Sequence, residues 1–227
     1  MLLITAVVGG IGVLAVVGLI LIGGGPTRAE ATALTTPASP TPVALADGRT
    51  LGRADAPVTL EVWTDFQCPI CGEFARTIEP ALVSTHVMPG TLRIVHHDAA
   101  FQGAKSTSAY DESVEAAAGA RCAADQGGYW PFQDWAFANQ AGENKGGFAA
   151  PRLTAIASAA GLDITTWKAC VATGQQQGAA RAETDAALAS GTNATPTMSI
   201  NGQMIVGLRS AQALSALIDA AAAANGG

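Results

Sequence analysis

Residues 58–71 read VTLEVWTDFQCPIC, and this stretch decides the fold prediction. Its first half, residues 58–64, is β-branched, aromatic and apolar, and it predicts a β-strand. The residues that follow predict a helix over 69–87, because apolar residues recur there at helical spacing. Pro80 lies inside this helix and is expected to kink it. The stretch therefore predicts a strand, a short turn and a helix whose first turn carries two cysteines.

These two cysteines, Cys68 and Cys71, form a C-x-x-C pattern at the expected start of the helix. A cysteine at a helix N-terminus faces unpaired N–H groups and the positive end of the helix dipole, which lower the pKa of its thiol. The second cysteine lies one turn further on, within disulfide reach, and Pro69 suits the first helical position. The pattern indicates a redox-active pair; a zinc site or an inert structural disulfide is the alternative. Zinc would need a second close pair, and Cys122 and Cys170 are far apart in the sequence, so we predict no metal and no cofactor.

The rest of the folded part completes an α/β core that is interrupted by a helical subdomain. A second strand is predicted at 92–96, and strands at 197–200 and 203–206 are joined by Asn-Gly, the strongest short-range hairpin signal. Between them, residues 106–190 are rich in alanine and show no strand pattern. Their helices are expected near 107–126, 129–139, 150–160, 164–173 and 175–190. A last helix is expected to start at the N-cap candidate Ser210.

The N-terminal residues differ from the rest in composition. Residues 2–22 carry no charge and are long enough to cross a bilayer as one helix. We therefore predict a transmembrane anchor over residues 1–22, with a signal peptide cleaved near residues 29–31 as the alternative. Residues 23–47 are rich in Pro, Thr and Ala and predict a linker without a core. The folded domain is then expected over 48–227, outside the cytoplasm, held at the cell membrane by a single span or secreted after cleavage.

The charge balance limits the partners of the protein. The 227 residues include 12 basic and 18 acidic side chains, which gives a formal net charge of −6 at pH 7. Phosphate binding needs a basic surface, so this balance argues against nucleic acid as the main partner.

Four segments occur in an order that is typical of one family. Residues 65–71 (DFQCPIC) follow a strand, and residues 194–197 (ATPT) precede the hairpin. Residues 126–140 (QGGYWPFQDWAFANQ) lie in the helical part, and residues 52–57 (GRADAP) come ahead of the strand. Together these segments resemble the DsbA-like thiol–disulfide oxidoreductases of the thioredoxin superfamily, in particular the membrane-anchored bacterial members. The resemblance covers about residues 50–227 and implies a thioredoxin-like fold with an inserted helical subdomain.

The resemblance also implies roles for single residues. Cys68 would be the nucleophile and Cys71 the resolving cysteine. The peptide bond between Thr195 and Pro196 would be cis and would face Cys68, and its backbone would pair with an extended substrate chain. An ordinary turn before a strand is the alternative for these two residues.

The activity implied by the resemblance is thiol–disulfide exchange, with oxidation of cysteines in exported proteins as the leading direction. The partners would be unfolded or reduced exported proteins, together with a quinone-linked thiol oxidase of the membrane that reoxidises the pair. A disulfide reductase or isomerase with the same site is the close alternative. A peptide-binding holdase or assembly factor, whose disulfide is only structural, is an alternative from another class.

Two positions depart from the family pattern. Many oxidising members have His where this chain has Ile70. An isoleucine side chain cannot stabilise a thiolate. We therefore expect the pKa of Cys68 to be lowered less than in those members, and the cysteine pair to be less oxidising than theirs. The family's buried acid usually lies at the position that Val62 occupies here. Its neighbour Glu61 is a candidate proton-transfer group, although successive strand residues point to opposite faces. Asp65 is interpreted as a turn or helix-entry residue.

The remaining cysteines, Cys122 and Cys170, both fall in the predicted helical subdomain. Outside the cytoplasm two such cysteines would not usually stay free, so we predict a structural disulfide between them. Two buried thiols or a second redox pair are the alternatives.

Overall fold

A computed structural model describes residues 33–105 and 109–225 of the chain. One compact unit extends over Leu34–Gly227. The predicted anchor at 1–22 and the first part of the predicted linker lie outside the described residues. Within the described part of the chain, no helix is long and apolar enough to cross a membrane.

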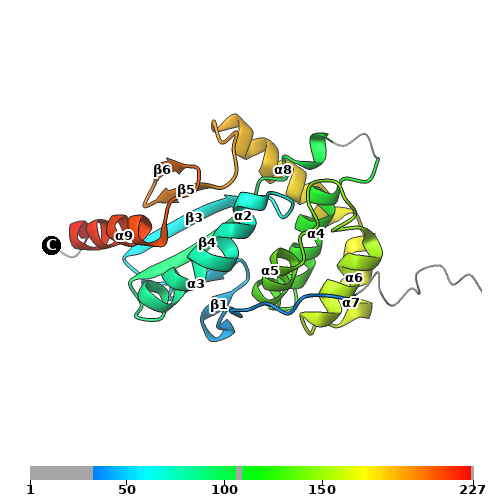
Figure 1. Cartoon of the computed structure of the whole chain (residues 1–227), viewed down its shortest axis with the longest axis horizontal. Helices are drawn as coiled ribbons and strands as arrows, with labels where there is room; N and C mark the ends of the chain where they lie inside the picture. Colours follow the sequence, from blue (N-terminus) through cyan, green and yellow to red (C-terminus); the bar gives the residue numbers. More distant parts are fainter. Residues whose placement is uncertain (1–32, 106–108, 226–227) are drawn as a thin grey trace, which may run out of the picture. The chain divides into compact units, whose positions relative to one another are not determined.

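Six strands form one sheet in the order β1-β2-β4-β3-β5-β6 (Figure 1). The strands are β1 (Ala46–Asp47), β2 (Thr50–Leu51), β3 (Val58–Thr64), β4 (Leu92–Asp98), β5 (Thr197–Ile200) and β6 (Gln203–Val206). β3 and β4 are parallel, which requires a crossover connection, whereas β2–β4, β3–β5 and β5–β6 are antiparallel. The predicted α/β core is confirmed, with the two short strands β1 and β2 as additions that the sequence pattern did not indicate.

The central strand β3 alternates between two faces. Val58, Leu60 and Val62 are buried, while the residues between them are partly exposed. The crossover helix and the C-terminal helix α9 (Ala211–Asn225) cover the buried face. Because the crossover helix begins directly after β3, its first turn lies at the end of the buried face.

The crossover helix contains two π-helical turns. It consists of α2 (Pro69–Glu73) and α3 (Glu79–Leu82), and a π-helical turn follows each of them. The first of these turns, Phe74–Ile78, lies directly before Pro80. Proline lacks an N–H and its ring crowds the preceding turn, so a widened turn accommodates it within an otherwise continuous helix. The predicted disturbance at Pro80 thus takes the form of a π-helical turn.

The hairpin of β5 and β6 turns at Asn201 and Gly202, with φ angles of 48° and 84°. Positive φ at both positions is the requirement of a type I′ turn, whose twist matches that of the flanking strands. Asn201 Oδ1 also accepts a hydrogen bond of 2.8 Å from Thr59 N. The predicted hairpin is therefore confirmed, and its turn is fastened to β3.

The predicted helical insertion lies between β4 and β5. Its helices are α4 (Glu112–Ala124), α5 (Tyr129–Ala138), α6 (Ala150–Ala159), α7 (Ile164–Ala172) and α8 (Gln175–Ala189). α4 is at the centre and contacts the other four. A Cβ atom at Gly119 would lie 3.0 Å from Phe132 and Trp167, and the Trp167 indole donates to the Gly119 carbonyl at 2.9 Å. Small residues on α4 thus allow the close packing of this subdomain.

A network of ion pairs fastens the insertion to the sheet. The Glu183 carboxylate of α8 lies 2.7 Å from Arg49 Nη1 and 3.0 Å from His97 Nδ1, and it also accepts from Arg121. Arg121 of α4 pairs in addition with Asp98 at the end of β4. Burial alone would raise the pKa of Glu183, but the hydrogen bonds from His97 and Arg49 and the Arg49 charge hold it well below its ordinary value.

We expect Glu183→Ala to lower the free energy of unfolding by about 3 kcal/mol at pH 7, because it leaves two partly buried arginines without this partner. Urea unfolding of both proteins measures the difference. The matched control is Asp185→Ala on the exposed side of the same helix, with an expected effect below about 0.5 kcal/mol. Because the folded-state pKa of Glu183 is lowered, its contribution is complete above the unfolded pKa of about 4 and declines as the pH falls below it. A difference that persisted unchanged on further acidification would contradict the assignment.

Residues 34–47 pack on the domain, so the prediction of a free linker is wrong for this part. Thr35 N donates to Asn139 Oδ1 at 2.8 Å, and Asn139 Nδ2 donates to the Thr35 carbonyl at 2.9 Å. Thr41 donates to the Asp134 carboxylate from its N–H at 2.7 Å and from its hydroxyl at 2.9 Å. Leu34 and Leu45 also pack against the hydrophobic core. The proline-rich composition of the segment therefore hides a docking with both polar and apolar contacts.

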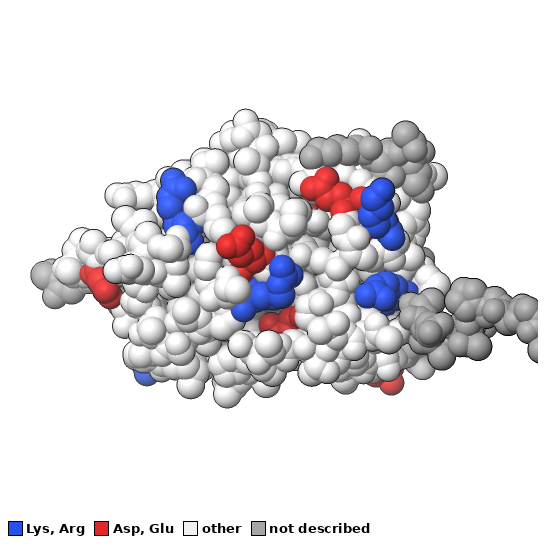
Figure 2. All heavy atoms as spheres, viewed as in Figure 1, with Lys and Arg blue, Asp and Glu red and all other residues white. Residues whose placement is uncertain are grey.

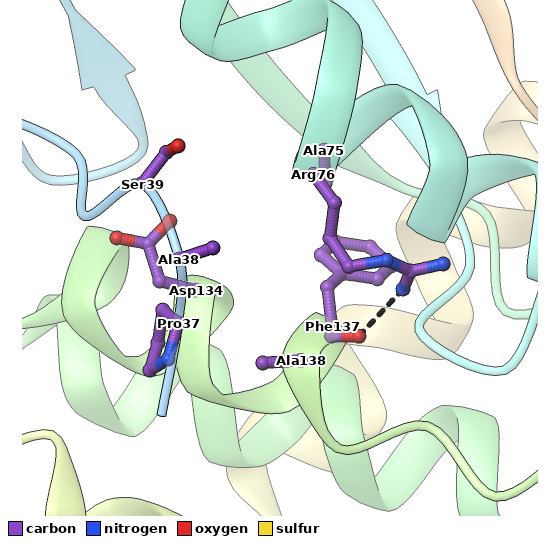
Figure 3. A pocket seen from close by; sticks show the side chains of 8 residues that line it. All are labelled: Pro37, Ala38, Ser39, Ala75, Arg76, Asp134, Phe137 and Ala138. Carbon is purple, nitrogen blue, oxygen red and sulfur yellow. Dashed lines mark hydrogen bonds between the residues drawn. The ribbon is translucent and has the colours of Figure 1, made fainter. Parts of the chain in front are cut away.

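A small cavity of about 60 Å³ lies beside this docked segment (Figure 3). Pro37, Ala38 and Ser39 line one side, and Arg76 and Phe137 line the other. Arg76 Nη1 donates to the Phe137 carbonyl at 2.6 Å. A cavity of this size has room for only a few water molecules, so it is not a substrate site.

Candidate active site

The cysteine pair lies between the end of β3 and the first turn of α2. Cys68 caps the helix: its Sγ accepts from Cys71 N at 3.5 Å, and Pro69 occupies the first helical position. Both cysteines are free thiols, and they are only 3% and 0% exposed. Ile70 between them is 42% exposed and projects an apolar side chain to the surface.

The surroundings of Cys68 favour its thiolate. The hydrogen bond with Cys71 has the largest effect and lowers the pKa of Cys68, whereas burial raises it. Hydrogen bonds with Thr195 and with the backbone N–H groups of Cys71 and Ile70 lower it further. The pKa of Cys68 is about 6, compared with an ordinary value of 9.0. Burial and the contact with Cys68 raise the pKa of Cys71 well above its ordinary value. At neutral pH, Cys68 is therefore the thiolate of the pair and Cys71 is its protonated thiol. Ile70 takes part through its backbone, which needs no polar side chain.

Alkylation of the reduced protein is expected to reach half of its maximal rate near pH 6, because the thiolate of Cys68 is the reacting form. Cys71 is expected to stay unmodified at neutral pH, because it is buried and its pKa is raised. Rates of iodoacetamide reaction across the pH range, with the modified residue identified by mass spectrometry, test both statements. A midpoint near the ordinary thiol value of 9.0 would contradict the first.

The loop before β5 lies against the cysteine pair. Its Thr195–Pro196 peptide bond is cis. Cys68 Sγ lies 3.5 Å from the Thr195 carbonyl oxygen, to which it donates a hydrogen bond only when it is protonated. Gly207 N donates to the Pro196 carbonyl at 3.0 Å, which ties the loop to the end of β6. The fold thus brings Thr195 and Pro196 from near the C-terminus to the sulfur of Cys68.

Asp65 is a central residue of the site rather than only a turn residue. It is 1% exposed, and its carboxylate accepts hydrogen bonds of 2.8 Å from Gln67 N, Gln102 N and Ser113 Oγ. Burial raises the pKa of Asp65 to about 6 against the lowering effect of these donors. No sequence signal marks this role, because Gln102 and Ser113 are distant in the chain and only the fold brings them to the carboxylate.

Two glutamines hold the loop that precedes Cys68. Gln67 Nε2 donates to Ser113 Oγ at 2.8 Å. Gln140 Nε2 donates to the carbonyls of Phe66 at 2.7 Å and Cys68 at 2.9 Å. Ser113 and Gln140 both belong to the inserted part of the chain, so the insertion determines the conformation of the cysteine loop.

Glu61, the candidate proton-transfer residue, does not lie on the side of the sheet that α2 covers. Its Oε1 is 3.4 Å from His97 Nε2, on the partly exposed face of β3. Val62, on the opposite face, is buried. The carboxylate that the fold places beside the cysteines is Asp65.

Cys122 of α4 and Cys170 of α7, for which the sequence predicts a structural disulfide, are joined with a Cα–Cα distance of 5.9 Å and a sequence separation of 48. Cys122 is fully buried. The bond therefore links two helices inside the insertion.

Histidine and carboxylate side chains also meet in the core, away from the thiols. Buried His96 lies 2.6 Å from Glu79, Nε2 to Oε1, and Gln133 donates to the other Glu79 oxygen at 2.8 Å. Within the described residues, no group of three or more His, Cys, Asp or Glu side chains is arranged to hold a metal ion.

The family model described as thioredoxin matches residues 45–220, which include the sheet, the insertion and the cysteine pair. The chain belongs to the thioredoxin family. It is a DsbA-like member of this family.

Solved structures of this type superpose over most of the chain. BdbD from Bacillus subtilis has a TM-score of 0.67 at 19% identity, covering 83% of this chain and all (100%) of BdbD. DsbA from Mycobacterium tuberculosis has a TM-score of 0.63 at 25% identity, covering 79% of this chain and 100% of that one. DsbG from the same organism has a TM-score of 0.61 at 26% identity, with 82% and 94% covered.

A curated relative of this DsbA-like chain is much longer. Na(+)/H(+) antiporter NhaA 3 of Salinispora tropica is 30% identical over 167 residues, which cover 74% of this chain but 24% of that protein. This chain thus spans about a quarter of the length of that relative.

Proposed function

We propose that this DsbA-like chain is an extracytoplasmic oxidase that introduces disulfides into exported proteins through Cys68 and Cys71. The observation that carries the proposal is the Cys68 thiol, buried at a helix N-terminus with its pKa lowered to about 6 and 3.5 Å from the Thr195 carbonyl. A thiolate that is stable in the reduced protein makes Cys68 a good leaving group and favours the reduced form of the pair. A pair that favours its reduced form donates its disulfide readily.

The exchange proceeds in two balanced steps. A substrate thiolate attacks Cys68 Sγ of the oxidised pair, the Cys68–Cys71 bond breaks, and a mixed disulfide forms. The Cys71 sulfur takes a proton, because its pKa is high. A second substrate thiolate then attacks the substrate sulfur of the mixed disulfide and expels Cys68 as a thiolate. The substrate loses two electrons and gains a disulfide, and the pair gains both electrons.

Substrate binding would use the backbone of Thr195, which is partly exposed beside Cys68. An extended chain can pair with this backbone whatever its side chains are. The face shown in Figure 2 carries few charged side chains, of both signs and without a patch of one sign. Such a surface suits substrates that differ in sequence and share only an unfolded segment with a cysteine.

The location and the reoxidising partner are part of the proposal. Residues 1–22 would anchor the domain to the outer side of the cell membrane, or would be removed as part of a signal peptide. An anchored domain would lie close to a quinone-linked thiol oxidase of the membrane, which could accept the electrons of the reduced pair. The disulfide between Cys122 and Cys170 supports an oxidising location.

Reductase or isomerase activity is the second candidate. The same two thiols perform both reactions, and only the electron supply and the stability of the disulfide distinguish them. In this direction, reduced Cys68 attacks a substrate disulfide and Cys71 resolves the mixed disulfide.

The reduction potential of the pair, measured by equilibrating the whole chain with glutathione buffers, separates the candidates. A value of about −120 to −180 mV supports the oxidase, and a value near −270 mV supports a reductase. A pair that did not exchange with glutathione would favour a peptide-binding protein with a structural disulfide.

A further inference from the structure

The exchange steps above do not use the buried carboxyl group of Asp65. This group shares one turn of the chain with both thiols: Cys68 N donates to the Asp65 carbonyl at 3.0 Å, and the Asp65 backbone N–H is directed at the Cys71 sulfur. Asp65, Cys68 and Cys71 are all buried, with exposed fractions of 1%, 3% and 0%. Charges on these groups therefore interact in surroundings from which water is largely excluded.

Among the described residues, the hydrogen-bond partners of the Asp65 carboxylate are neutral groups. Two are backbone N–H groups, of Gln67 and Gln102, and the third is the Ser113 hydroxyl. The charged group that acts on Asp65 is the Cys68 thiolate, and the two negative charges oppose each other. Two neighbouring buried acids do not ionise independently, because ionisation of the first disfavours ionisation of the second.

We propose that Asp65 is a positioning residue whose negative charge disfavours the thiolate form of Cys68. When this thiolate forms, the Asp65 carboxylate takes up a proton, so that the two groups share roughly one proton in the reduced protein. The inference rests on the proposed function of Cys68 and Cys71. It differs from a merely structural role of Asp65 because it ties the charge of the carboxyl group to the redox state of the pair.

Asp65 provides a site for one of the two protons that are taken up or released when glutathione reduces the Cys68–Cys71 disulfide. Two glutathione molecules deliver two electrons and two protons, the Cys68–Cys71 bond breaks, and glutathione disulfide leaves. One proton stays on Cys71 Sγ. The second goes to the Asp65 carboxylate or to solvent, while Cys68 remains a thiolate. In the oxidised protein no thiolate faces Asp65, so its carboxyl group gives this proton up more readily.

Other ionisable residues face this region from the packed elements. Asp111 and Glu112 begin α4, and both carboxylates accept from backbone N–H groups. Glu143 and Lys145 flank Asn144, which donates its N–H to Gln67 Oε1. The side-chain hydrogen bonds of Asp111 and Glu112 go to backbone N–H groups of Val114, Gly146 and Phe148 and not to the thiols.

The test is the pH titration of the Cys68 thiolate in the reduced whole chain, followed by its ultraviolet absorbance, for the wild type and for Asp65→Asn. Removing the opposing charge is expected to move the thiolate midpoint to lower pH by about one unit, a tenfold change in the ionisation constant. The equilibrium with glutathione is expected to shift about tenfold toward the reduced protein. Loss of packing alone would not stabilise the thiolate, so the direction of the shift separates the two roles.

Two further variants keep the test decisive. Asn144→Ala removes hydrogen bonds from the same loop without changing a charge, and it is expected to leave the midpoint in place. Ser113→Ala removes one donor from the Asp65 carboxylate, which disfavours its ionisation, and is expected to shift the midpoint in the direction of Asp65→Asn by a smaller amount. If Asp65→Asn does not fold, the thiolate midpoint of Ser113→Ala tests the proposal in its place.

An unchanged or raised midpoint in the folded variants would overturn the inference while leaving the proposed function intact. A wild-type protein whose exchange with glutathione did not depend on Cys68 would instead overturn the proposed function. The two failures are therefore distinguishable.

Discussion

Cys68→Ser is expected to lower the rate of disulfide exchange with a substrate protein by at least roughly a thousandfold, because a serine hydroxyl neither ionises at neutral pH nor forms a disulfide. Cys68 is the cysteine with the lowered pKa and the one in contact with the Thr195 carbonyl. Its loss removes the attacked sulfur of the oxidase reaction and the attacking sulfur of the reductase reaction. The measurement is the rate of oxidative refolding of a reduced protein with two cysteines, at fixed glutathione.

Cys71→Ser is the matched control, because it keeps the nucleophile and removes only the second sulfur. This variant is expected to accumulate a mixed disulfide between Cys68 and the substrate, visible as a covalent complex on a non-reducing gel. The hydrogen bond with Cys71 is the largest contribution to the low pKa of Cys68, so Cys71→Ala, which removes this donor, should show a raised thiolate midpoint. Exchange that persisted in Cys68→Ser would place the active thiol elsewhere and contradict the assignment.

Local patterns in the sequence predicted the elements that carry the site. The strand at 58–64, the helix after it and the Asn-Gly hairpin each depend on neighbouring residues, and the structure has all three. The two thiols also follow from one short motif, because the helix start itself supplies their chemistry. Contacts between distant residues were not predictable in the same way.

Asp65 shows why the rest of the site could not be found from the sequence. A buried acid was expected on β3, and Glu61 was chosen for its place in the strand, but the pleat of β3 directs it to the face away from α2. Asp65 stands in a turn, where aspartate is common for local reasons. Its burial depends on Gln102 and Ser113, which only the folded insertion brings to it.

The docked segment at 34–47 illustrates the same limit. Its proline-rich composition is that of a linker, and its attachment depends on Asp134 and Asn139 of α5 and its C-cap. No pattern within the segment indicates these partners. Composition therefore could not exclude that the segment docks on the core of the domain, where Leu34 and Leu45 pack.

Replacing Cys122 and Cys170 together by alanine is expected to lower the free energy of unfolding by about 4 kcal/mol, because the disulfide closes a loop with a sequence separation of 48 in the unfolded chain. The double variant avoids a single free thiol that could react with Cys68. Urea unfolding of the whole chain at pH 7, followed by circular dichroism, measures the loss. A decrease below about 1 kcal/mol would contradict the chain-entropy argument.

The same double variant tests whether this disulfide is only structural. The insertion reaches the active site through Ser113, at the start of α4, and Gln140, after α5, whereas Cys122 and Cys170 join α4 to α7. The contact of Trp167 with Gly119 also holds α7 to α4 without the bond. We therefore expect the reduction potential of Cys68 and Cys71 to stay unchanged where the variant is folded. A shifted potential would mean that the bond also acts on the loop around Asp65, and that the insertion tunes the chemistry of the pair as well as holding its geometry.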